Sequence, residues 1–516
     1  MKDHRFLING EPIPTVTDDP IKCLGKVYDS TLRDLRNADQ VAQELKRWLR
    51  AIDKSSLLGK HKAWCFQFGI IPRLQWPFLL YDISMTKISQ MERLVSRYLR
   101  NWLGLPQCFS AANLYSKNSP VPKPLSSTVE EYKAAKCRAV MSLRTSKDDK
   151  VIEAGEHITT GRKWNPQTAV DTAISRLKHK DVVGTVCISR QGLGNYGKQT
   201  WHDADARTRR DKVVKEVREA EEEERMVHLK GLYGQGEWTR WSGTIDKRTS
   251  WSEAWKIDDG KLNFVLRAVF DLLPSPSNLK RWGKAFDSKC FICNKEKCTL
   301  RHILNSCRKS LAEGRYRWRH DQVLKSIANI IDSEIRACNS RHVVSVNNAM
   351  PSIEFVKEGG AASQRTKVNK RCAILSRASD WHMMVDIGKQ LRMPTDIVTT
   401  TLRPDMVIRS DSERIVILSE LTVPWEDRIE EAHEGKLLKY TDLVENIRAN
   451  GWQVYYFPVE VGSRGFPAKS FKFMLNSIGL SNQSCRKACK IVGSAAEEGS
   501  RWLWLKRAEP WKNGGV

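Results

Sequence analysis

Four residues of metal-binding type lie close together near the middle of the chain. Cys290, Cys293, His302 and Cys307 have the spacing C-x2-C-x8-H-x4-C. Two cysteines separated by two residues can hold one tetrahedral ion from a tight turn, and a later histidine and cysteine complete a closed structural site. A fifth thiol, Cys298, lies in the same stretch and is an alternative ligand. The spacing predicts a structural Zn²⁺ site, and a group of buried free cysteines is the competing interpretation.

Two carboxylates stand beside predicted strands further along the chain. The segments MVI (406–408) and RIVILSELTV (414–423) are rich in β-branched residues and flank the polar turn RSDSE, which predicts a β-hairpin. Glu420 interrupts the apolar second strand, where an unpaired carboxylate is costly. Asp405 precedes the first strand and is a natural partner. Two converging carboxylates can hold Mg²⁺ against a phosphate, where the ion polarises the phosphoryl oxygen and activates water.

A helix is predicted after Pro424, because apolar residues recur there at steps of three and four. Lys436 lies in the inward stripe of this helix, and Lys439 borders it. A lysine in a buried stripe is unusual without an anionic partner, which the carboxylates would supply. Such a lysine would stabilise negative charge on a phosphate. The alternative is a lysine whose ammonium group extends along the surface to solvent.

Cations alternate with aromatic residues in the segment RYRWRHD, directly after the cysteine group. Arginines bind phosphates, and aromatic rings stack on bases, so this segment predicts a nucleic-acid contact. The candidate contact residues are Arg315, Tyr316, Arg317, Trp318, Arg319 and His320. The alternative is the start of a helix whose Trp318 packs inward.

The order of elements around the carboxylates resembles a known nuclease fold. This order is similar to that of the PD-(D/E)xK fold of restriction-like endonucleases. It runs from a helix through RPD, the hairpin and ELT to a helix with KLLKY and a final strand. The resemblance implies Asp405 and Glu420 as Mg²⁺ ligands. The family's usual lysine, two residues after the acidic one, is Thr422 here. Retrotransposon members move that lysine into the following helix, which implies Lys436 first and Lys439 second.

Two further residues enter through the same resemblance. Arg403 fits the basic residue that precedes PD in the family. Asp386, in the predicted helix SDWHMMVDIGKQL (379–391), is implied as the upstream acidic residue of the catalytic group.

The wider chain resembles the C-terminal part of non-LTR retrotransposon proteins that carry a restriction-like endonuclease. The cysteine group followed by RYRWRH is similar to the CCHC zinc knuckle that precedes this endonuclease. FLINGEPIPTV, YDSTLRDL and LGKHKAWCFQFGIIPRLQWPF resemble the regions that follow the polymerase palm. The similarity covers most of the chain, but only the zinc group and the nuclease core have specific motifs.

The resemblance implies a Mg²⁺-dependent DNA endonuclease that nicks target DNA for target-primed reverse transcription. The implied partners are the DNA target, the element RNA and an upstream polymerase portion of the same polyprotein, with action in the nucleus after synthesis in the cytoplasm. The Asp-Asp pairs in TDDP, KDDK and IDDG do not lie between apolar strands, so no reverse transcriptase activity is expected. The alternative function is a catalytically inactive nucleic-acid-binding remnant of a retroelement.

Composition agrees with a polyanionic partner. The chain has 86 lysines and arginines against 60 acidic residues, a net charge of +26. No stretch approaches the roughly 20 apolar residues of a spanning helix, so no membrane partner is expected. The 13 cysteines are an odd number and mostly scattered, which argues against a disulfide framework.

We expect a multidomain chain with mostly α N-terminal and middle regions and a C-terminal α/β domain of the PD-(D/E)xK type. The expected regions are a helical thumb-like region at 1–120, a basic tryptophan-rich helical region at 128–285, the zinc knuckle with its following helix at 286–345, the endonuclease at 370–465 and a C-terminal tail at 466–516. A polar patch at 356–371 predicts a linker. The glutamate run in a predicted helix at 207–231 indicates a solvated face.

Overall fold

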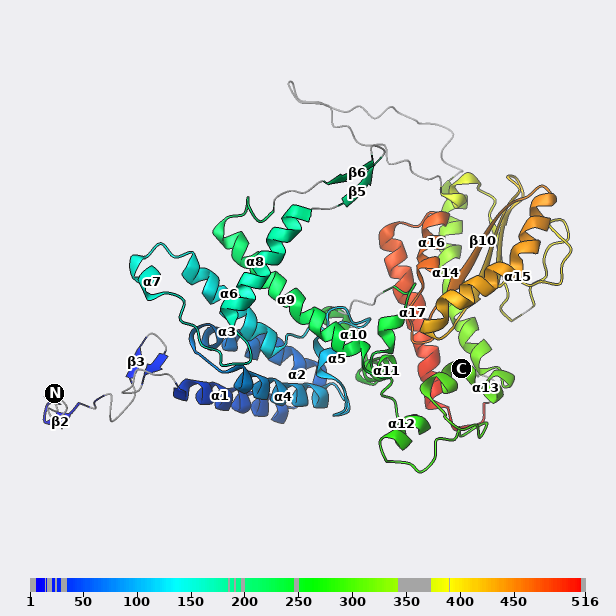
Figure 1. Cartoon of the computed structure of the whole chain (residues 1–516). Coiled ribbons are helices and arrows are strands. Elements are labelled where there is room, and N and C mark those ends of the chain that lie inside the picture. The colour runs from blue at the N-terminus through cyan, green and yellow to red at the C-terminus, as the bar shows by residue number, and fades with distance from the viewer. Residues whose placement is uncertain are drawn as a thin grey trace, which may run out of the picture. The chain divides into compact units, whose positions relative to one another are not determined.

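The protein is mostly helical and has a small mixed sheet near its C-terminus (Figure 1). The computed structural model describes residues 6–13, 15, 21–23, 26–28, 35–183, 186–189, 192–195, 200–245, 250–341, 373–388 and 390–511. This agrees with the expected mostly α regions followed by a C-terminal α/β region. Among the helices that the structure describes, none has both the length and the apolar character that crossing a bilayer requires.

The chain divides into two compact units. The first comprises residues 1–236 and 248–263, and the second comprises residues 237–247 and 264–516. The expected middle region 128–285 is therefore not one domain but is shared by both units. The expected linker at 356–371 lies outside the described residues.

The first unit is a helical bundle with short strand pairs. Its helices are α1 (Leu35–Lys54), α2 (Gly59–Cys65), the π-helix η1 (Phe66–Ile70), α3 (Ile71–Leu80), α4 (Met85–Trp102), α5 (Ala111–Tyr115), α6 (Thr128–Arg144), α7 (Asp149–Ala154), α8 (Pro166–Val183), α9 (Ala206–Lys230) and α10 (Trp251–Lys256). Antiparallel pairs are formed by β1 (Leu7–Ile8) with β2 (Glu11–Pro12), β3 (Ile21–Cys23) with β4 (Lys26–Tyr28), and β5 (Val186–Ser189) with β6 (Gly192–Asn195).

Helix α4 shows how the sequence forms this bundle. Ser84 caps its N-terminus by accepting from the Lys87 backbone N–H, and the buried Ile88, Val95 and Leu99 recur at helical spacing. The proline-rich stretch after α5 does not separate domains, because α6 packs against α3 and α4. Tyr132 of α6 donates a hydrogen bond of 2.5 Å to the carbonyl of Ile83. The expected regions 1–120 and 128–285 therefore join in one bundle up to α9.

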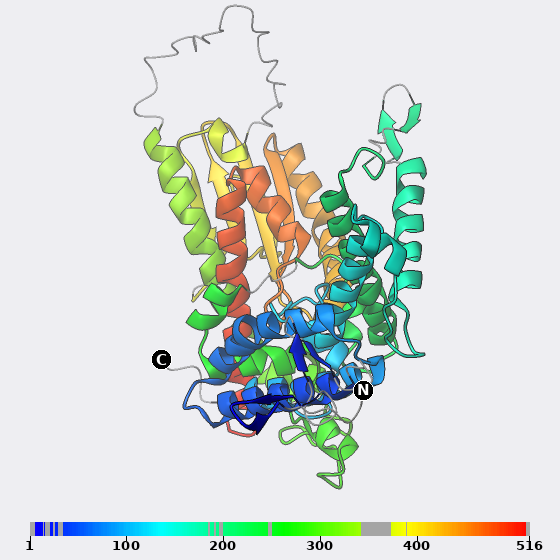
Figure 2. The same ribbon diagram turned by 90° about the vertical axis from the view of Figure 1, so that its left-hand side faces the viewer.

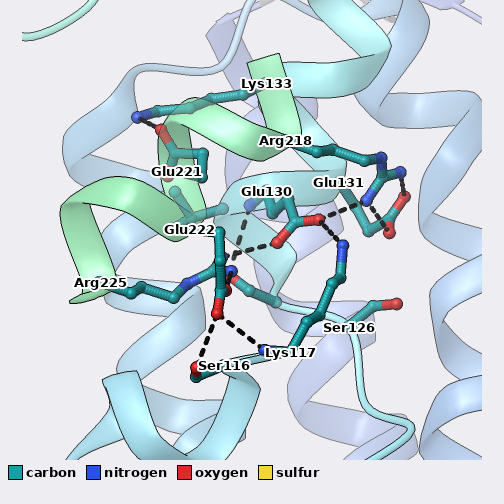
Figure 3. Close-up of polar contacts among 12 residues, drawn as sticks. Ser116, Lys117, Ser126, Glu130, Glu131, Lys133, Arg218, Glu221, Glu222 and Arg225 are labelled. Atoms are coloured by element: carbon teal, nitrogen blue, oxygen red, sulfur yellow. Dashed lines mark hydrogen bonds and ion pairs between the residues drawn. The ribbon is translucent and has the colours of Figure 1, made fainter. Parts of the chain in front are cut away.

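The expected solvated face of the glutamate run in α9 is confirmed for Glu223 and Glu224, which are exposed, and is wrong for other glutamates of this helix. Glu216 and Glu222 are buried. Glu222 Oε1 accepts from the Ser116 hydroxyl at 2.6 Å and from the Lys117 backbone N–H at 2.9 Å (Figure 3). Glu216 and Glu222 lie inside the bundle because α9 packs on α5, α6 and α8, a contact that one-dimensional charge patterns do not encode.

The centre of this ionic network is Glu130, near the start of α6. Its carboxylate accepts from Lys117 Nζ at 2.9 Å, Arg218 Nη1 at 2.8 Å and Arg225 Nη2 at 2.7 Å (Figure 3). Burial alone would raise the pKa of Glu130, but Arg225, Lys117 and Arg218 lower it to about 2. Arg218 also donates from its two terminal nitrogens, Nη1 and Nη2, to the Glu131 carboxylate. The network fastens α6 to α9.

The second unit is built on a four-stranded sheet with the order β10-β9-β8-β7. Its strands are β7 (His382–Val385), β8 (Met406–Ser410), β9 (Ile415–Thr422) and β10 (Gln453–Glu460). The expected hairpin is confirmed as the antiparallel pair β8–β9. β10 is parallel to β9, and the chain reaches it through the expected helix, α15 (Ile429–Ala449).

Helices cover both faces of the sheet (Figures 1 and 2). The helices of this unit are η2 (Glu237–Arg240), α11 (Asp259–Val269), whose first residues belong to the first unit, α12 (Pro276–Arg281), the π-helix η3 (His302–Ser306), α13 (Arg308–Ala312), α14 (Arg315–Arg341), η4 (Ile374–Arg377), η5 (Glu426–Arg428), α15, α16 (Lys469–Ile478) and α17 (Asn482–Leu505). One face packs on α15 through Val407, Val416 and Leu418. The other face packs on α14, α16 and α17, and includes Ile408 and Ile417.

Two expectations for this unit are wrong. The predicted helix at 379–391 is instead the strand β7, which pairs antiparallel with β8. A short apolar run such as HMMV does not distinguish a strand from a helix by its period. The segment 466–516 is not a tail, because α16 and α17 contribute Phe471 and Val492 to the core beneath the sheet.

Candidate functional site

The cysteine group forms a compact cluster of ligand atoms. The ligand atoms of Cys290, Cys293, His302 and Cys307 all lie within 4.8 Å of one another, and Cys293 Sγ is 3.3 Å from His302 Nε2. Cys298 is outside this group, and burial raises the pKa of its thiol. The four residues first chosen from the spacing therefore could hold a metal ion such as zinc.

Local backbone turns bring the two cysteines of the C-x2-C motif to one side. The backbone N–H of Asn294 donates to the Cys290 carbonyl at 3.0 Å, and that of Cys290 donates to the Lys295 carbonyl at 2.9 Å. Asn294 has a φ of 54°, a left-handed conformation that asparagine tolerates better than most residues. The π-helix η3 then presents His302, and Cys307 follows it directly.

The segment after the cysteines mostly supports the fold. Tyr316 accepts from the Cys307 backbone N–H at 3.0 Å and donates to the Ile303 carbonyl, which ties α14 to the metal-binding turn. Arg315 is 2% exposed and donates to the carbonyls of Lys506 and Glu509, each at 2.8 Å. These contacts use the guanidinium and hydroxyl groups that were expected to meet nucleic acid.

Arg319 is buried in the same way. Its side chain is 1% exposed and donates to the Ser500 hydroxyl at 2.9 Å and to the Val423 carbonyl at 3.3 Å. The expected phosphate contacts of Arg315 and Arg319 are therefore wrong, because carbonyls within the unit already occupy both cations. The ring of Trp318 lies edge-on to that of Trp511, with 5.5 Å between the ring centroids. The Arg317 side chain is exposed and remains a candidate contact for nucleic acid.

The two predicted carboxylates converge with the first-choice lysine. Glu420 is 4% exposed, and Lys436 Nζ donates to its Oε1 at 2.5 Å. Its Oε2 accepts from the Tyr440 hydroxyl at 2.9 Å and from the Asp405 backbone N–H at 3.2 Å. Lys436 thus pairs with the carboxylate rather than extending to solvent. Lys439 borders the site, with its Nζ 3.9 Å from Glu420 Oε1.

Asp405 is fixed by the strand beside it and by α14. Its Oδ2 accepts from the Leu421 backbone N–H at 2.7 Å and lies 3.3 Å from His320 Nε2. Burial lowers the pKa of the His320 imidazole, but hydrogen bonds with Asp321 and Asp405 outweigh it and raise the pKa to about 9. His320, expected to meet nucleic acid, is therefore a cation beside the candidate metal ligand.

Asp386 and Arg403 lie at the border of this site. Asp386 follows β7, and its backbone N–H donates to the Asp405 carbonyl at 2.8 Å. The Asp386 carboxylate accepts from the Leu391 backbone N–H at 2.7 Å and lies 3.9 Å from Arg317 Nη2. The Arg403 side chain is exposed, and its carbonyl oxygen lies 2.9 Å from the Tyr440 hydroxyl oxygen, whose single proton it shares with Glu420 Oε2.

The carboxylates of this site are ligands of the type that Mg²⁺ binds, but their oxygen atoms are not gathered as closely as the ligand atoms of the cysteine group. Carboxylate oxygens such as those of Asp405 and Glu420 are the ligands that Mg²⁺ prefers. In the described part of the chain, however, the oxygens of Asp386, Asp405 and Glu420 do not form a compact group like that of the cysteines. Lys436 and His320 lie against the carboxylates instead and balance their charge.

Helix α1 presents a basic surface that the sequence did not single out. Lys46, Arg47, Arg50 and Lys54 are exposed, whereas Leu45 and the rest of its apolar stripe face the bundle. The signal was present as basic residues at helical spacing, opposite the apolar positions. We name this set the α1 basic face.

No family model matches the chain, and neither does any curated protein.

Proposed function

We propose that the second unit is a Mg²⁺-dependent DNA endonuclease of the PD-(D/E)xK type. The observation that carries this proposal is the contact of Lys436 Nζ with Glu420, 2.5 Å long, beside Asp405 on the neighbouring strand. A buried carboxylate, a second carboxylate at a strand end and a lysine are the groups that such a nuclease needs. The mixed sheet between helices is compatible with that fold.

Each residue then has a chemical task. Asp405 and Glu420 would hold Mg²⁺, which when bound polarises the phosphoryl oxygen and makes water more acidic. Lys436 stabilises the negative charge that develops on the phosphate. Tyr440 and the Leu421 backbone N–H orient the two carboxylates. Water adds to phosphorus, the bond from phosphorus to the 3′ oxygen breaks, and a 3′ hydroxyl remains on the nicked strand.

A 3′ hydroxyl in DNA is a primer, which suits a retrotransposon polyprotein. We infer that the chain is the C-terminal part of a non-LTR retrotransposon protein, with the zinc group as its knuckle. It would act in the nucleus on a DNA target, with the element RNA and an upstream polymerase portion as partners. The motifs that support this inference are C-x2-C-x8-H-x4-C and the RPD and ELT segments of the hairpin.

A nucleic-acid-binding remnant without catalysis is the second candidate. The α1 basic face and the net charge of +26 favour it, because polyanion binding needs charge alone. This function does not require Asp405, Glu420 and Lys436 to meet.

Nicking of supercoiled plasmid DNA by the full chain separates the two functions. The endonuclease should convert the plasmid to open circles with Mg²⁺ and stop when EDTA is added. DNA binding at low salt without any nicking under these conditions would favour the remnant and reject the enzyme.

A further inference from the structure

A buried carboxylate paired with a histidine lies in the same unit, and neither residue has a role in the mechanism proposed above. Glu460, at the end of β10, is 1% exposed. Its Oε1 is 3.0 Å from His433 Nδ1, and its Oε2 accepts from the Ser470 hydroxyl at 2.5 Å. Burial raises the pKa of the Glu460 carboxyl, and the hydrogen bonds with Ser470 and His433 oppose that rise. The His433 side chain remains 34% exposed, so this pair can be reached from solvent.

The sheet register places this pair beside the proposed active site. On the parallel strands β9 and β10, Pro458 is opposite Glu420 and Glu460 is opposite Thr422. Because side chains alternate along a strand, Glu420, Thr422 and Glu460 belong to one face of the sheet. A step of two residues along a strand is about 7 Å. Glu460 is therefore one such step from the level of Glu420.

Helix α15 carries both bases over that face. His433 precedes Lys436 by three residues, so the two side chains are neighbours on one side of the helix. The Tyr456 hydroxyl of β10 donates to the Lys436 carbonyl at 3.0 Å and fixes the helix on the sheet. The Glu420–Lys436 and Glu460–His433 pairs thus form consecutive rungs between the sheet and α15.

A buried hydroxyl lies at the level of the Glu460–His433 pair on the sheet. Thr422 Oγ1 is buried and has no hydrogen-bond partner among the residues that the structure describes. Buried hydroxyl groups are almost always satisfied, so an unpaired one points to a bound water or ligand oxygen. Such an oxygen would lie on β9 at the level of Glu460.

We propose that His433 takes the proton from the attacking water and that Glu460 is its positioning residue. This inference rests on the nuclease proposed above. An ionised Glu460 carboxylate can only accept, so the imidazole would donate its Nδ1–H to Oε1, which leaves the lone pair of Nε2 as the proton acceptor. The water proton moves to Nε2, the water oxygen bonds to phosphorus, and the 3′ oxygen leaves with the electron pair of the broken bond. That oxygen takes a proton from solvent, and the imidazolium returns its own to solvent.

Rescue by free imidazole tests the role of His433. A positioned base typically contributes about 10²-fold or more, so His433→Ala should slow plasmid nicking by about that factor. Added imidazole should restore much of the rate, because the vacated pocket is open to solvent. His382→Ala removes an exposed histidine of β7 and serves as the matched control, with the parent rate expected.

The remaining outcomes are distinct. His433→Ala that nicks as fast as the parent overturns the inference, as does a slow, folded variant that imidazole does not restore. A parent protein that never nicks rejects the proposed function itself, and this inference with it.

A second readout does not depend on activity. Nitrogen NMR of the histidine side chains in the zinc-containing parent without added Mg²⁺ should show His433 protonated at Nδ1, and Glu460→Gln should produce a mixture of both tautomers. An Nε2-protonated His433 in the parent overturns the proton-accepting role.

Discussion

Two buried carboxylates, Glu130 in the first unit and Glu420 in the second, are neutralised differently. In the first unit, Glu130 contacts Lys117, Arg218 and Arg225 at 2.7–2.9 Å (Figure 3). In the second unit, Glu420 has one close cation, Lys436, and its other partners are a tyrosine hydroxyl and a backbone N–H. The first cluster is saturated by cations from the chain itself.

The chemical type of the cations beside each carboxylate matters as much as their number. Arginines cannot lose their proton and hold carboxylates in a fixed fork, so Arg218 and Arg225 close the cluster around Glu130. Lys436 is on a flexible stem and remains 27% exposed, so it can turn from Glu420 toward an incoming phosphate. The cysteine group is the most open case, because its four ligand atoms lie within 4.8 Å of one another and could together hold an added metal ion. Open clusters can accept an added ion or substrate, and saturated ones stabilise the fold.

Zinc content should give the largest effect. Structural zinc in small peptides has an apparent binding free energy of about 10–16 kcal/mol, so protein purified without chelators should contain about one zinc per chain. Cys307→Ala should lose that zinc, whereas Cys298→Ala should keep it, because Cys298 lies outside the ligand group. Metal analysis of both variants checks this. Loss of zinc from Cys298→Ala alone would show that the ligands are assigned incorrectly.

Removal of Glu130 should mainly destabilise the first unit. Glu130→Ala removes the carboxylate that the partly buried Arg218 and Arg225 share, while Glu131 and Glu222 remain as their partners, so the free energy of unfolding should fall by about 1–3 kcal/mol. The exposed Glu224→Ala on α9 is the matched control, with a change within about 0.5 kcal/mol. Urea unfolding measures both. Equal stability of the two variants would remove the distinction between saturated and open clusters.

Removal of Lys436 should mainly change the reaction rate. Loss of one charge-stabilising group costs about 10²–10³ in rate, so Lys436→Ala should nick plasmid DNA that much more slowly, with a milder effect for Lys439→Ala. The exposed Lys487→Ala on α17 should match the parent. If Lys439→Ala is the slower variant, Lys439 takes the role of charge stabiliser and Lys436 that of its neighbour.

Acid should weaken the saturated cluster over a defined range. The folded-state pKa of Glu130 is lowered from 4.5 to about 2, so its contribution is complete above the unfolded value and is lost as the pH falls through 2. The difference corresponds to about 3 kcal/mol. The free energy of opening of α6, obtained from hydrogen exchange after correction for the intrinsic exchange rate at each pH, should therefore fall more steeply between about pH 5 and pH 2 in the parent than in Glu130→Gln. Equal slopes would show that Glu130 keeps its ordinary pKa.

The sequence predicted local features of the second unit well. The hairpin, α15 and the inward position of Lys436 follow from periodicity, and the cysteine group follows from spacing. These features depend on residues near one another in the chain. They were enough to place Asp405, Glu420 and Lys436 together.

Features that depend on distant partners were missed. From the sequence alone Arg319 resembles a phosphate-binding residue, but in the folded chain it donates to Ser500 of α17. Glu222 likewise resembles a solvated residue, but in the folded chain it accepts from the Ser116 hydroxyl. His433 gave no signal by itself, because it is on α15 and its partner Glu460 is at the end of β10, 27 residues further along the chain. Charge patterns along a chain do not reveal which charges will be buried.

Plasmid nicking by Glu420→Ala protein tests the endonuclease proposal most directly. Full-length parent, Glu420→Ala and Asp405→Ala proteins would be compared with Mg²⁺, and the exposed Glu445→Ala of α15 is the matched control. We expect the parent and Glu445→Ala to produce open circles. We expect Glu420→Ala and Asp405→Ala to produce none while binding DNA as tightly as the parent, because carboxylates repel phosphate. Open circles produced by Glu420→Ala at the parent rate would contradict the proposed endonuclease.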